Sequence, residues 1–152
     1  MIELSDLKRC SIRVLENIYE NEGAADVPQG VYKGTHLGWI EDNINHRQLL
    51  KSGIFLGFKL APYGIDFDRK RWFFINKNAR IGHFRAETER SRWRDTDAVC
   101  LHYESSRLPR MIRSHLYDEV KPLTDSLCLG VGGINKPDGG GDIFYFALTR
   151  IG

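Results

Sequence analysis

The sequence predicts a mainly β protein: an antiparallel barrel of eight strands preceded by one α-helix. From residue 30 onward, short stretches rich in β-branched and aromatic residues alternate with Gly, Pro, Asn and Asp. The turns between these stretches are short, which favours an antiparallel meander. A meander of about eight strands can close into a barrel that holds one small ligand.

The N-terminal helix is expected from Ser5 to Asn21. Its apolar residues recur near helical spacing, Ser5 or Asp6 can cap its start, and Gly23 ends it. We expect residues 1–23 to pack on the barrel, so that residues 1–152 form a single domain.

The strands are expected where β-forming residues alternate or cluster. They span residues 30–40, 54–60, 71–77, 80–87, 98–104, 111–121, 126–131 and 143–149. Turn signals stand between them, including Pro62-Tyr-Gly64 and the glycine-rich tip at 137–141. Residues 41–50 have a less regular pattern, which is compatible with a short helix across one end of the barrel.

Composition places the chain among ordinary globular proteins. It carries 22 Lys and Arg against 20 Asp and Glu, and this net charge of +2 favours neither a nucleic-acid nor a membrane partner. No bilayer-spanning apolar run and no secretory signal are visible, so we expect a cytoplasmic monomer or homodimer. Cys10, Cys100 and Cys128 are expected to be buried free thiols.

Several segments resemble lipocalin-like (calycin-type) barrels. Gly30-Val-Tyr-Lys-Gly34 resembles their Gly-x-Trp-x-Gly first strand, with Tyr32 in place of the tryptophan. Tyr117-Asp-Glu-Val-Lys121, Leu127-Cys-Leu-Gly130 and Phe144-Tyr-Phe-Ala-Leu148 are similar to the end of uncharacterised small bacterial barrels, where an Arg-Asp-Glu-Ile-Arg strand leads into Leu-Tyr-Leu-Gly. Tyr117 departs from the basic residue of that motif. The resemblance implies the fold and leaves the activity open, because lipocalin-like folds include carriers, haem binders and enzymes.

The polar residues of the strands sort into rows, because barrel strands alternate inward and outward. The segment from Arg113 to Lys121 places Arg113, His115, Tyr117 and Glu119 on one row and Asp118 on the other. If the Asp118 row points inward, Asp118 is a buried carboxylate and needs a partner such as Arg85 or Arg110. The polar rows can equally face solvent, since half-exposed sheets show the same alternation.

These rows predict cofactor-free acid–base catalysis of the isomerase, cyclase or lyase type on a small hydrophobic or aromatic molecule. Imidazole and carboxylate exchange protons near neutral pH, arginine holds an anion, and a tyrosine hydroxyl donates to an oxyanion. The expected catalytic residues are His102, Glu119, Tyr117, Arg85 and His83. The expected substrate-binding residues are Tyr32, His36, Phe58, Trp72, Phe74, Arg113, His115, Asp118 and Tyr145.

The alternative is a carrier or sensor of a hydrophobic ligand, including a haem binder with His36 or His83 as the axial ligand. No metal is expected, because the five histidines lack the close spacing that is typical of metal sites. A serine hydrolase is not expected either, because the chain has no Gly-x-Ser-x-Gly motif.

Overall fold

A computed structural model describes residues 1–40, 62–74, 80–134, 137 and 141–152. The expected strand at 54–60, the segment 41–50 and Phe58 lie outside the described residues. Phe74 ends a strand whose backbone is described, but its side chain is not.

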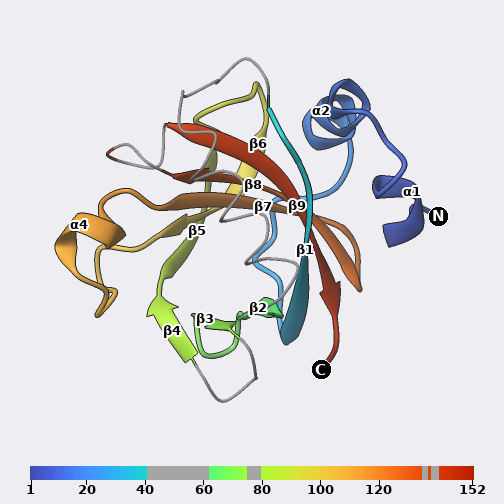
Figure 1. Cartoon of the computed structure of the whole chain (residues 1–152). Helices are drawn as coiled ribbons and strands as arrows, with labels where there is room; N and C mark the ends of the chain where they lie inside the picture. Colours follow the sequence, from blue (N-terminus) through green and yellow to red (C-terminus); the bar gives the residue numbers. More distant parts are fainter. Residues whose placement is uncertain (41–61, 75–79, 135–136, 138–140) are drawn as a thin grey trace.

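One antiparallel sheet contains all the strands of the described residues. It has nine strands in the order β4-β3-β2-β1-β9-β8-β7-β6-β5. Its edges, β4 and β5, are separated in the chain by Phe84 alone, so the sheet curls into a nearly closed barrel (Figure 1). The strands are β1 (Val31–Trp39), β2 (Tyr63–Asp66), β3 (Arg71–Phe74), β4 (Arg80–His83), β5 (Arg85–Arg90), β6 (Asp97–His102), β7 (Tyr117–Thr124), β8 (Leu127–Ile134) and β9 (Asp142–Arg150).

The prediction of eight strands is therefore wrong by one within the described residues. The expected strand at 80–87 is divided into β4 and β5 at Phe84, whose N–H donates to the Lys70 carbonyl at 3.0 Å. Gly82, next to this division, has a φ of +73°, which only glycine adopts without strain.

Two further segments differ from the prediction. The expected turn at Pro62-Tyr-Gly64 is strand β2, and Gly64 serves close packing: a Cβ there would lie 2.3 Å from the Phe73 ring. The start of the expected strand at 111–121 is instead a short helix, α4 (Arg110–Arg113), which follows Pro109, and β7 begins only at Tyr117.

The expected N-terminal helix is two helices, α1 (Leu4–Leu7) and α2 (Ile12–Asn21). Ser11 starts the second helix, because its Oγ accepts a hydrogen bond from the Val14 N–H at 3.3 Å. Gly23 follows α2 with a φ of +78°. In the described part of the chain no helix is long and apolar enough to cross a membrane.

The sheet carries a separate apolar cluster on each face. The outer cluster joins α1 and α2 to the sheet through Leu7, Leu15 and Tyr19, which pack with Leu129 and Tyr145 among others. The inner cluster fills the barrel and includes Val99, Leu101, Tyr103, Val120, Phe144, Phe146 and Leu148. Because Val120 lies in the inner cluster, Asp118 points into the barrel, and Glu119 and Lys121 point outward.

Candidate functional site

A chain of hydrogen bonds crosses the barrel interior from β3 to β7. The Trp72 indole N–H donates to the Tyr103 hydroxyl, and that hydroxyl donates to the Asp118 carboxylate. The carboxylate lies against Gly132 on β8, where a Cβ would come within 2.7 Å of Oδ1. Glycine at this position therefore makes room for the carboxylate.

Burial determines the protonation of this carboxylate. Desolvation raises the pKa of Asp118 to about 7; the hydrogen bond from Tyr103 acts in the opposite direction, and the charge of Glu119 adds to the rise. The pKa of the Tyr103 hydroxyl is raised well above its usual value by burial and by the neighbouring Asp118 charge, so the tyrosine remains a hydrogen-bond donor. Asp118 is thus an inward carboxyl group that changes its protonation near neutral pH.

Aromatic rings and two further polar groups surround this end of the interior. Tyr63 stacks on Trp72 with ring centroids 5.9 Å apart, and burial together with the Asp118 charge raises the pKa of its hydroxyl. The His36 ring lies 5.4 Å from the rings of both Trp39 and Phe144. Burial lowers the pKa of His36 to about 4, so its imidazole is neutral at neutral pH.

The opposite end of the interior is filled by apolar side chains. Tyr32 packs edge-on against Phe67 at 5.6 Å and donates to the Asp125 carbonyl at 3.3 Å. Cys128 and Leu148 pair across β8 and β9 in the same cluster. The polar end, which we define as Asp118, Tyr103, Trp72, Tyr63 and His36, is therefore a distinct region of the barrel.

Glu119 lies on the outer face, fully buried beneath α2 and the segment before β6. Its carboxylate accepts hydrogen bonds from the hydroxyls of Ser91 at 2.6 Å, Tyr19 at 2.8 Å and Tyr117 at 2.9 Å, and from the Arg92 N–H at 2.7 Å. These four donors match the acceptor capacity of a carboxylate. The geometry therefore suits anchoring rather than proton transfer to a ligand.

The structure corrects two expectations about these rows. Arg113 lies on α4 and His115 follows it, so of the four residues expected on one row, Tyr117 and Glu119 alone share a face of β7. The partner of Asp118 is Tyr103 rather than Arg85 or Arg110. Arg85 is half-exposed on β5 and paired with Glu87, and Arg110 is exposed on α4.

The remaining predicted site residues are divided among separate places. His102, Tyr117 and Arg113 line a pocket of about 220 Å³ beside α4. His83 lies in another surface hollow, with Nδ1 3.2 Å from the Ser105 hydroxyl. Tyr145 is buried on the outer face, with its ring centroid 6.2 Å from that of Tyr19 on α2.

Sequence reasoning missed Tyr63 and Tyr103 as members of the polar end. Tyr63 fell within an apparent turn, and Tyr103 shared its row with the apolar Val99 and Leu101. A buried tyrosine hydroxyl needs a hydrogen-bond partner, and this requirement was the signal that an inward carboxylate lies nearby.

No group of three or more His, Cys, Asp or Glu side chains gathers closely enough to hold a metal ion within the described ranges of the chain. The candidate site is accordingly built from single side chains of different elements: His36 on β1, Tyr63 on β2, Trp72 on β3 and Asp118 on β7, with Tyr103 just after β6.

Comparison with known proteins supports the fold. No family model matches the chain, and no curated protein does. The chain is similar to a crystal structure of a protein from Thermomonospora curvata, with a TM-score of 0.54 and 18% sequence identity over 94% of this chain and 89% of that chain. At this identity the likeness shows a shared architecture and carries no statement about activity.

Proposed function

We propose that the polar end of the barrel binds a small, largely apolar or aromatic molecule and performs acid–base chemistry on it, with Asp118 as the proton carrier. The barrel would then use its interior as lipocalin-like proteins do. The observation that carries the proposal is the inward carboxyl of Asp118, which lies among aromatic rings and has a pKa of about 7. A proton carrier works best when its pKa lies near the working pH.

The neighbouring groups have complementary roles in this proposal. The Trp72–Tyr103 chain orients the carboxylate by donating to it. Tyr63 and the neutral His36 can donate to a polar atom of the ligand, such as a carbonyl oxygen on which negative charge develops. Isomerisation, cyclisation and elimination are reaction classes that need only such a proton carrier and such donors.

A non-catalytic carrier is the second candidate, and the aromatic lining favours it. Trp39, Trp72, Phe144 and Phe146 all contribute to the inner cluster. Such rings bind an apolar ligand whether or not a proton is transferred. Binding alone therefore does not separate the two candidates.

Acetophenone is a suitable probe, because it combines one aromatic ring, one carbonyl oxygen and exchangeable methyl protons. We expect the parent chain to bind it, in NMR saturation-transfer measurements, and to accelerate deuterium exchange of its methyl group. Asp118→Asn, which keeps the side-chain shape, should bind acetophenone and lose the acceleration. Glu104→Gln is the matched control, because Glu104 is exposed and outside the barrel interior.

Gly132→Ala tests whether the probe binds in the interior. A Cβ at Gly132 would lie 2.7 Å from the Asp118 carboxylate and 2.6 Å from the Phe144 ring, so binding should be lost. Gly38→Ala is its control, because that Cβ meets only the flexible end of Ile12 on the outer face. Binding without acceleration in the parent supports the carrier, and unchanged binding to Gly132→Ala contradicts an interior site.

A further inference from the structure

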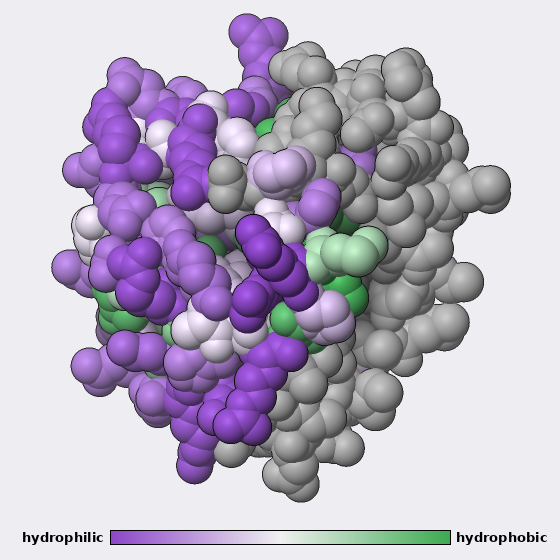
Figure 2. Space-filling model, turned by 90° about the vertical axis from the view of Figure 1, so that its left-hand side faces the viewer, coloured by the Kyte–Doolittle hydropathy of each residue, from purple (hydrophilic) through white to green (hydrophobic). Residues whose placement is uncertain are grey.

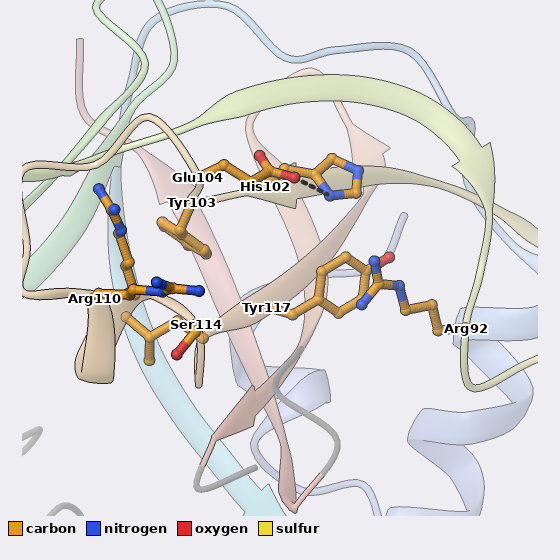
Figure 3. A pocket seen from close by; sticks show the side chains of 9 residues that line it. Arg92, His102, Tyr103, Glu104, Arg110, Ser114 and Tyr117 are labelled. Carbon is orange, nitrogen blue, oxygen red and sulfur yellow. Dashed lines mark ion pairs between the residues drawn. The ribbon is translucent and has the colours of Figure 1, made fainter. Parts of the chain in front are cut away.

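A pocket of about 220 Å³ lies where β6 ends and β7 begins, beside α4. We call it the rim pocket. Figure 3 shows side chains from these elements and from the segment before β6 converging on it; those that matter here are Arg92, His102, Glu104, Arg110, Arg113 and Tyr117. We propose that the rim pocket binds a small organic anion that presents a carboxylate or a phosphate group. This goes beyond the function proposed for the interior: Tyr103 borders both regions, but the arginines on which this proposal rests line the rim pocket and are not part of the polar end.

Charge is the first argument for an anion. Three guanidinium groups, those of Arg92, Arg110 and Arg113, line the pocket together with one carboxylate, that of Glu104. Glu104 is 70% exposed, and its carboxylate also lies 3.9 Å from Arg85. The chain from residue 105 to residue 117 contains no acidic residue, so the α4 side of the pocket is positive.

Arg92 is held in position by an aromatic ring. Its guanidinium carbon lies 3.8 Å from the centre of the Tyr117 ring, and Figure 3 shows the two groups stacked. The Tyr117 ring packs in turn against Trp93 at 5.1 Å and His102 at 5.6 Å. The Tyr117 hydroxyl donates to the buried carboxylate of Glu119, and this hydrogen bond holds the Tyr117 side of the pocket in place.

Arg113 is held by a neutral acceptor. Its Nη1 donates to the carbonyl of Ser106 at 2.9 Å, and Ser106 is buried. Arg110 precedes Arg113 by three residues, about one helical turn, so the two guanidinium groups reach the pocket from neighbouring positions. Donors that are already positioned lose less conformational entropy when an anion binds, and guanidinium recognises carboxylate and phosphate with two parallel hydrogen bonds.

His102 is fixed on the wall formed by β6. Its Nε2 lies 3.1 Å from the Glu89 carboxylate, and its Nδ1 lies 3.9 Å from that of Glu104, the ion pair drawn in Figure 3. The side chain is only 9% exposed. His102 therefore shapes the pocket, while the arginines supply its charge.

The size and the lining of the rim pocket indicate the class of anion. The volume of about 220 Å³ is below the range of roughly 300–1,000 Å³ that is typical of drug-sized ligands. Tyr117 and Leu116 add an apolar wall beside the charged groups. The described part of the face that carries α4 is mainly hydrophilic, with small hydrophobic areas between hydrophilic residues (Figure 2). A single-ring carboxylate or phosphate ester fits this combination.

The test uses benzoate, phenyl phosphate and inorganic phosphate as probes, with the full chain in isothermal titration calorimetry at low salt. We expect benzoate or phenyl phosphate to bind with 1:1 stoichiometry. Arg113→Gln and Arg110→Gln should each weaken binding by about tenfold or more, because a hydrogen bond to a charged group contributes about 1.5–3 kcal/mol. Arg107→Gln is the matched control: it removes the same charge nearby, but Arg107 lines a different hollow.

The probes also distinguish the sources of the anion. A preference for benzoate assigns the pocket to a carboxylate, and a preference for phenyl phosphate or inorganic phosphate assigns it to a phosphate group. Absence of binding of all three probes overturns the proposal, as does equal weakening by Arg107→Gln, which would show general charge attraction.

If Arg113→Gln fails to fold, the exposed Arg110 gives the decisive variant. Asp118→Asn should leave anion binding unchanged, so this proposal and the interior site can fail separately.

Discussion

Asp118 and Glu119 are neighbours in the chain but have opposite environments. Successive side chains of a strand point to opposite faces, so Asp118 faces the barrel interior and Glu119 faces α2. Four hydrogen bonds satisfy Glu119, whereas Asp118 accepts a hydrogen bond from the Tyr103 hydroxyl and has a raised pKa. The same chemical group thus anchors a helix at one position and is suited to carry a proton at the next.

Glu119→Ala should destabilise the fold strongly. The substitution leaves the buried hydroxyls of Tyr19 and Tyr117 without their acceptor, and we expect a loss of about 3–5 kcal/mol in the free energy of unfolding. Urea unfolding measures this loss. The control Glu104→Ala, at an exposed position, should change stability by less than about 0.5 kcal/mol. Equal stability of both variants would exclude the anchoring role.

The stability of the chain should depend on pH through Asp118. Its pKa of about 7 in the folded chain lies above the ordinary value of 3.8, so the fold favours the protonated form. The resulting stabilisation is complete below about pH 4 and is lost as the pH rises to about 7. Three pKa units correspond to about 4 kcal/mol at most. Asp118→Asn should remove this pH dependence of the free energy of unfolding. Urea unfolding of the parent and of the variant at several pH values measures the dependence. Identical pH profiles of the two chains would contradict the role of Asp118.

At the scale of residues, the sequence predicted the kinds of side chain better than their positions. It selected Asp118, His36 and Trp72, which the structure brings to one end of the interior. Period-two alternation defines two rows on a strand but does not state which row is inside. That choice depends on apolar partners from other strands, which a single segment does not contain.

At the scale of elements, the break between α1 and α2 depends on Ser11. Its Oγ accepts from the Val14 N–H and satisfies one of the free donors at the start of α2. Ser11→Ala should lower the free energy of unfolding by about 1 kcal/mol in urea denaturation. Ser5→Ala is the control, because Ser5 is exposed within α1; an equal effect of both substitutions would contradict the capping role.

Strands with strong alternation were predicted close to their observed positions, and special residues caused the errors. The expected strand at 143–149 lies within β9 (Asp142–Arg150), and the strand at 30–40 contains β1 (Val31–Trp39). Gly64 was interpreted as a turn residue, whereas it makes room for the Phe73 ring inside β2. The role of such a glycine depends on its neighbour in space, so local sequence patterns do not reveal it.

At the scale of the whole molecule, Phe84 joins the two edges of the sheet. It lies between β4 and β5, is fully buried, and packs against Phe67 at 6.0 Å and Tyr103 at 6.3 Å. Phe84→Ala should lower the free energy of unfolding by about 3–5 kcal/mol. Thermal and urea unfolding measure this effect, with the exposed Met111→Ala as the control. A loss below about 1 kcal/mol would show that the junction does not hold the barrel together.

The barrel itself was predictable because its turn spacing and its strand composition agree over most of the chain. The ninth strand was not predictable from the sequence. The division at Phe84 arises from the curvature of the closing sheet rather than from a turn motif. The polar end and the rim pocket also form only after closure. Each combines residues from elements that are distant in the chain.

The function proposed for the interior requires that Asp118 carries a proton near neutral pH inside the barrel. The most direct test is an NMR titration of its side-chain carboxyl carbon in the full chain, with Asp118→Asn to identify the resonance. We expect a titration midpoint near pH 7. A midpoint near the ordinary value of about 4 would contradict it, because Asp118 would then be fully ionised at neutral pH and unsuited to carry the proton.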